Sequence, residues 1–167
     1  LKEKANIAVS LLDYLHLDLS DLKATRVQTP PFERPNLEIR RRLPDLDPGF
    51  FRPVSRFEEF IIVHSLEEIR EFEAEYGLSI HSLEDFLKAL AKAFERKLGW
   101  GVVAVKSTLA YLRTLRFERV PRAEAQRLFE RIFRHKGEGL SWEEARPLQD
   151  FLMHQVIRHS MEHGLPI

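Results

Sequence analysis

The stretch 101–115 reads GVVAVKSTLAYLRTL, and within it an apolar run of strand-forming residues ends at Lys106. Side chains alternate along a β-strand, so Val102, Ala104 and Lys106 share one face of the predicted strand. A buried strand avoids an unpaired ammonium, because burying such a charge is expensive. Lys106 therefore either extends into solvent from the end of the strand or lies in a polar site at that end.

The rest of the chain predicts an alternation of strands and helices. Short apolar runs predict strands over 7–12, 51–56 and 102–106, and 165–167 is typical of the first residues of another strand. Capping residues and apolar stripes predict helices over 66–76, 83–98, 122–135 and 142–163, with a break or restart of the last one at Pro147. This order predicts an α/β fold of parallel strands with helical crossovers, in a single domain over residues 1–167. The proline-rich segment 25–53 is predicted to be a long covering or functional excursion.

Composition and charge exclude several functional classes. Lys plus Arg and Asp plus Glu number 26 each, so no net electrostatic field favours nucleic acid or an anionic membrane. No apolar stretch approaches the roughly 20 residues of a membrane span, and the absence of a secretory signal pattern favours a cytoplasmic protein. The chain has no cysteine, so a thiolate metal site or nucleophile is excluded. Both ends look cut within an element, which predicts an internal fragment of a longer protein.

Two segments carry a family resemblance. GVVAVKSTLAYLRTLRFE at 101–118 and LSWEEARPLQDFLMHQVIRHSMEHGLPI at 140–167 resemble the metal-dependent amidohydrolase superfamily, of the uronate isomerase-like "amidohydrolase 2" type. The resemblance implies a partial (β/α)₈ TIM barrel that covers about strands two to four, since a whole barrel needs about 250 residues. It also implies one or two divalent metals, with zinc expected, whose ligands mostly lie on strands outside this chain. Lys106 alone matches a metal-site position, and it would act as a ligand only when carboxylated.

Four residues are the main candidates for the site, and Asp13 is a fifth. Lys106 is expected to be catalytic, at the carboxyl end of a barrel strand where barrel enzymes place their chemistry. Arg113 is expected to bind a substrate carboxylate through two hydrogen bonds while Tyr111 lines the pocket. The sequence fits equally well with Arg113 as an ordinary arginine of a surface loop. Arg56 is a substrate-binding candidate at another strand end, where a surface ion pair with Glu58 is the alternative. The same alternatives hold for Asp13 at the end of the first strand.

Other charged and basic residues favour structural interpretations. His159 and His163 could share a helix face, as metal-binding pairs do, but they lie far from the expected mouth of a barrel. Histidines in a last helical turn also interact favourably with the helix dipole. The run 40–42 of three arginines is surrounded by acidic residues, which favours a solvated charge run over a nucleic-acid contact.

These observations predict a metal-dependent hydrolase of the amidohydrolase superfamily. Metal-activated water would attack a carbonyl-type bond of a small, carboxylate-bearing substrate. Two alternatives stay open: an isomerase or decarboxylase of the same superfamily, and a non-catalytic α/β module that binds a ligand or partner. Because a partial barrel has open strand edges, we expect self-association of the isolated chain, and a homo-oligomer is compatible with the sequence.

Overall fold

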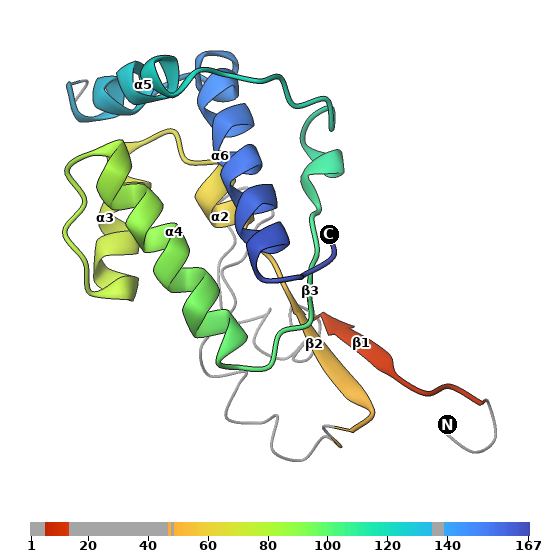
Figure 1. Ribbon diagram of the computed structural model, residues 1–167. Coiled ribbons are helices and arrows are strands. Elements are labelled where there is room, and N and C mark those ends of the chain that lie inside the picture. The colour runs from red at the N-terminus through yellow and green to blue at the C-terminus, as the bar shows by residue number, and fades with distance from the viewer. Residues whose placement is uncertain (1–5, 14–46, 48, 135–138) are drawn as a thin grey trace, which may run out of the picture.

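The computed structural model describes residues 6–13, 47, 49–134 and 139–167 (Figure 1). Regular structure alternates between strands and helices along this part of the chain. The elements are β1 (Ser10–Asp13), β2 (Phe51–Ser55), α2 (Glu58–Ile61), α3 (Leu66–Tyr76), α4 (Leu83–Leu98), β3 (Ala104–Val105), the 3₁₀ helix η4 (Leu109–Tyr111), α5 (Arg122–Arg134) and α6 (Trp142–Glu162). The fold is therefore α/β, as the sequence predicted, and most of the excursion predicted at 25–53 lies outside the described residues.

The three strands form one parallel sheet in the order β1-β2-β3. In this register Asp13 lies opposite Val54, and Val54 lies opposite Ala104. The backbone N–H of Lys106 donates to the Ser55 carbonyl at 2.9 Å, while that of Val105 donates to the Pro166 carbonyl at 2.8 Å. The Val105 N–H thus bonds to residue 166 and not to β2, so the chain at residue 166 lies beside β3. Residues 165–167, predicted to begin another strand, are not a strand in the structure, but they lie beside the chain at β3, as Figure 1 shows at the C-terminus.

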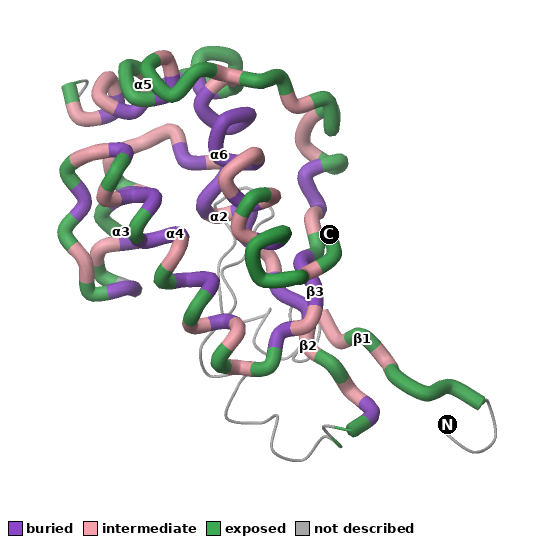
Figure 2. The backbone as a smooth tube through the Cα atoms, in the orientation of Figure 1, coloured by how far each residue is buried: buried purple, intermediate pink, exposed green. Residues whose placement is uncertain are grey.

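Helices and one face of the sheet enclose a hydrophobic core. Large apolar side chains from α2, α3, α4, α5 and α6 meet there, and Val105 of β3 joins them. Aromatic rings dominate the packing, with Phe57 stacked on Phe94 at a centroid distance of 3.9 Å. Buried and exposed residues alternate along these helices, and the buried segments, purple in Figure 2, lie toward the middle of the molecule. Because Val105 points into this core, its neighbour Lys106 leaves the strand on the opposite face.

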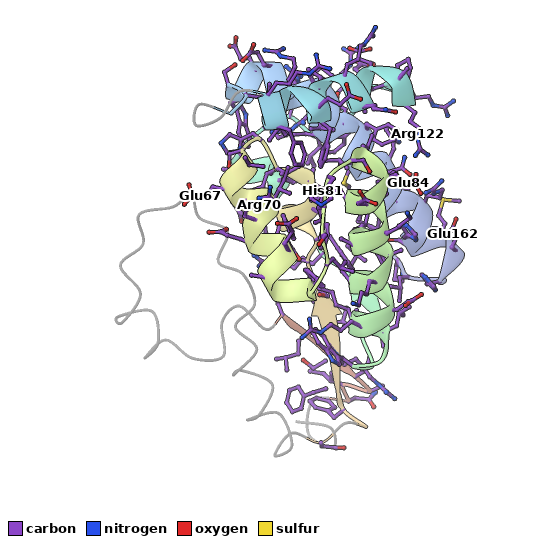
Figure 3. The ribbon with its side chains drawn as sticks, turned by 90° about the vertical axis from the view of Figure 1, so that its left-hand side faces the viewer. Glu67, Arg70, His81, Glu84, Arg122 and Glu162 are labelled. Carbon is purple, nitrogen blue, oxygen red and sulfur yellow. The ribbon has the colours of Figure 1, made fainter. Side chains whose placement is uncertain are left out.

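Polar contacts fix the helix ends where the sequence predicted them. Capping boxes join Ser65 to Glu68 at the start of α3 and Ser141 to Glu144 at the start of α6. At the start of α4, the Ser82 side chain accepts a hydrogen bond from the Asp85 backbone, so this predicted cap is also confirmed. An ion pair between Arg122 of α5 and Glu84 of α4 links the first turns of two helices on the surface (Figure 3).

The predicted break at Pro147 is wrong. α6 runs without interruption from Trp142 to Glu162, with Pro147 in its second turn. A proline there removes one backbone hydrogen bond near the helix start. The apolar stripe of α6 outweighs that loss, because Leu148, Leu152 and Val156 are all buried in the core.

Smaller differences concern the lengths of the elements. β1 begins and ends later than predicted and includes Asp13, and β3 keeps only two residues of the predicted 102–106. The short helix α2 was not predicted, because four residues are too few to show a helical period. None of the helices in the described ranges combines the length and the apolar character that crossing a bilayer requires.

Candidate functional site

Three charged residues lie at the carboxyl ends of the three strands of the sheet. Asp13 is the last residue of β1, Arg56 comes directly after β2, and Lys106 comes directly after β3. Because the strands are parallel, their carboxyl ends lie side by side. Asp13 is level with Val54 and Ala104, and Arg56 and Lys106 each lie two residues farther along their segments. Ligands of open and closed parallel α/β sheets bind at this end of the strands. We call Asp13, Arg56 and Lys106 the strand-end cluster.

Both cations of the strand-end cluster bind the same carboxylate oxygen. Arg56 Nη2 lies 2.5 Å from Asp13 Oδ2, and Lys106 Nζ lies 2.6 Å from that oxygen. The side chains of Asp13 and Arg56 are mostly buried, whereas that of Lys106 is 44% exposed. Burial acts to raise the pKa of Asp13, but hydrogen bonds from Lys106 and Arg56 outweigh it and lower the pKa. The strand-end cluster therefore has the ionised Asp13 carboxylate at its centre and the Lys106 ammonium within reach of solvent.

A buried carboxyl group holds the chain just beyond Lys106. Glu58, the first residue of α2, accepts hydrogen bonds through Oε1 from the backbone N–H of Thr108 at 2.5 Å and from its hydroxyl at 3.2 Å. Burial raises the pKa of Glu58. Arg56 forms its ion pair with Asp13, and Glu58 is buried, so the alternative of a surface pair between Arg56 and Glu58 does not describe this site. Glu58 instead ties the segment after β3 to the segment after β2.

A buried lysine fixes the backbone of Arg56. Lys97 Nζ, at the end of α4, donates to the Arg56 carbonyl oxygen and to Glu59 Oε1, the latter at 2.9 Å. The ammonium also lies 4.0 Å from the centroid of the Phe57 ring, a favourable cation–π position. Sequence reasoning missed Lys97, because a lysine in the last turn of a helix is ordinarily a solvated partner of the helix dipole.

Arg113 is engaged in the interior. Its guanidinium is 4% exposed, donates to an Asp150 oxygen and to Gln149 Oε1 of α6, and lies 4.7 Å from the centroid of the Phe117 ring. The other Asp150 oxygen accepts the backbone N–H of Glu118 at 3.1 Å. The predicted binding residue Arg113 thus holds the loop after η4 onto α6.

Tyr111 and the candidate histidines lie apart from these contacts. Tyr111, at the end of η4, is 86% exposed. The rings of His159 and His163 stack with Phe94 at centroid distances of 5.2 and 6.1 Å. The pKa of His159 is lowered, mainly by burial. Both histidines pack against the buried Phe94 of α4, in agreement with the structural interpretation of this pair.

The described residues do not form a metal site. Within the ranges that the structure describes, no three side chains of His, Cys, Asp or Glu gather in a way that could hold a metal ion. In the strand-end cluster, Lys106 and Arg56 place two cations against one carboxylate. This charge balance is unfavourable for a divalent cation within the strand-end cluster itself, and the resemblance places most metal ligands outside this chain.

Comparisons with known proteins give a likeness in fold. No family model and no curated protein matched the chain. The solved structure of uronate isomerase from Thermotoga maritima matches with a TM-score of 0.57 and 23% sequence identity. The match covers 77% of this chain and 28% of that chain, so the chain spans less than a third of the length of the structure it matches. At this identity the match shows that the α/β arrangement is shared, which agrees with the uronate isomerase-like resemblance at the level of the fold.

Proposed function

We propose that this chain contributes the strand-end cluster to the active site of a TIM-barrel enzyme that acts on a small-molecule substrate. The observation that carries the proposal is the meeting of Asp13, Arg56 and Lys106 at the carboxyl ends of three parallel strands. Barrel enzymes bind their substrates at this end, on the residues and loops that follow the strands. The likeness in fold to uronate isomerase supports the barrel, of which this chain would supply part.

Each residue of the strand-end cluster has a proposed role. Lys106 is the group that solvent reaches, and its ammonium has donors beyond the one bound to Asp13. Arg56 is less exposed and binds the same oxygen, so together the two cations suit an anionic group such as a substrate carboxylate. Asp13 keeps the two cations together by offsetting their repulsion. Tyr111 is exposed enough to contact a ligand, whereas Arg113 would have to leave Asp150 to do so.

Hydrolysis of a carbonyl-type bond is the reaction that we propose first, from the amidohydrolase resemblance. Isomerisation is the second candidate, because the matching structure is that of a uronate isomerase. In either reaction a metal would need ligands outside the residues that the structure describes, so we derive no step through it. A binding module without catalysis is a third candidate, and its ligand would occupy the same cluster.

The test compares Lys106→Ala with Lys88→Ala in the natural gene product that contains this sequence. Lys88 lies on α4 and is exposed, so its replacement controls for the loss of a surface charge. Hydrolysis of a panel of carboxylate-bearing amides and esters, and isomerisation of uronates, would be measured for both variants. Losing a charged substrate contact is expected to lower kcat/KM about 100-fold in Lys106→Ala, with no change in Lys88→Ala. Equal activity of Lys106→Ala and the parent protein would contradict the proposal, and ligand binding without turnover would favour the module.

A further inference from the structure

We infer that Lys106 works as an unmodified ammonium group and is not a carboxylated, metal-bridging lysine. The resemblance to amidohydrolases implies that a lysine at this strand end can be carboxylated and bridge two metals. The contacts of Lys106 in this fold favour the opposite chemistry. The inference rests on the strand-end cluster of the proposed function, but not on the reaction that the protein catalyses.

The first argument comes from the partner of Lys106. Its Nζ donates to Asp13 Oδ2 at 2.6 Å, a charge-assisted hydrogen bond between a cation and an anion. Carboxylation would form a bond between Nζ and the carbon of CO₂, release protons from the nitrogen and leave an anionic carbamate. The carbamate would then lie beside the Asp13 carboxylate, so an attraction would become a repulsion between like charges. Asp13 therefore stabilises the unmodified form.

The second argument comes from Arg56. Its guanidinium is charged at any ordinary pH and binds the same Asp13 oxygen at 2.5 Å. This neighbour is held in place, because Lys97 binds the Arg56 backbone carbonyl and is itself paired with Glu59. A metal bridged by Lys106 would lie next to a fixed positive charge. Arg56 could instead pair with the carbamate, but it would then occupy the oxygens that the metals need.

The third argument comes from the other carboxyl groups near the strand-end cluster. Glu58 is buried, and its Oε1 is already occupied by the backbone and hydroxyl of Thr108. Glu59 is paired with Lys97. These contacts hold Glu58 on Thr108 and Glu59 on Lys97, whereas Asp13 is the carboxylate hydrogen-bonded to Lys106. Lys106 is thus a cation that Asp13 positions at the mouth of the site.

The experiment supplies the two components of the modification and follows the carbon atom. The natural gene product that contains this sequence would be incubated with ¹³C-labelled bicarbonate and zinc chloride. Its ¹³C NMR spectrum would be compared with that of its Lys106→Arg variant, which cannot form a carbamate at position 106. Lys88→Arg is the matched control for other lysines that react with CO₂ at the surface. Zinc content after gel filtration would be measured for the same proteins. We expect identical spectra and identical zinc content in the parent protein and in Lys106→Arg.

Two results would overturn the inference. One is a carbamate resonance that Lys106→Arg lacks and Lys88→Arg keeps, and the other is zinc that the parent protein binds and Lys106→Arg loses. Lys106→Gln serves as a second carbamate-free variant if Lys106→Arg fails to fold. The outcome is separate from that of the proposed function: a protein without enzymatic activity would still show whether Lys106 is carboxylated, and an active enzyme could contain either form of the lysine.

Discussion

Replacing Arg113 with methionine removes a buried guanidinium and keeps most of its apolar stem. The side chains of Arg113 and Asp150 are each 4% exposed, so the variant leaves the Asp150 carboxylate buried without its cation. Breaking a buried ion pair by removing one partner costs about 3–5 kcal/mol. Asp150 keeps one hydrogen bond, from the backbone N–H of Glu118, so we expect the lower end, about 3 kcal/mol. In a chain of this size that loss corresponds to a fall in Tm of about 6–12 °C.

Urea unfolding followed by circular dichroism would measure the change in free energy, with calorimetry for Tm. Arg116→Met is the matched control, because Arg116 lies in the same loop, is 81% exposed and pairs with the exposed Glu118. We expect the control to change stability by less than about 0.5 kcal/mol. A loss below about 1 kcal/mol in Arg113→Met would refute the reasoning, since a buried pair costs more than that to break. Arg113 would then be free to bind a substrate instead of holding its loop.

Two further predictions concern a helix end and a buried acid. Gly77 ends α3 with φ 60°, so Gly77→Ala should lower the free energy of unfolding by about 1 kcal/mol, measured by urea unfolding. Gly99 ends α4 in the right-handed region, so Gly99→Ala is the control and should leave stability unchanged. Equal losses of stability in the two variants would contradict the argument. Burial raises the pKa of Glu58 above 4.5, so the folded protein holds this proton more tightly than the unfolded chain, and stability should fall as pH rises from 4.5 through the raised pKa. Urea unfolding at several pH values over this range would give the free energy of unfolding as a function of pH. This pH dependence should be weaker in Glu58→Gln than in the parent protein, and the same pH dependence in both proteins would contradict the prediction.

Local signals in the sequence determined most of the helices and the order of the elements. Ser65, Ser82 and Ser141 begin helices where the sequence placed them, because a capping side chain bonds to a backbone N–H only two or three residues away. The alternation of strands and helices likewise predicted the parallel sheet. The sequence also identifies Lys106 as a lysine at a strand end, because side-chain alternation is a local property of the strand.

Only the tertiary structure decided what the charged residues contact. Asp13 and Lys106 are 93 positions apart and share a hydrogen bond because strand register brings them together, and no local pattern encodes that register. The same holds for Arg113 and Asp150, whose ion pair forms because α6 packs against the loop after η4. Pro147 stays inside α6 because the energy of burying a whole helix face exceeds the cost of one missing hydrogen bond. The sequence determines where helices and strands are locally favoured, but burial and ion pairing depend on which distant segments the folded chain brings into contact.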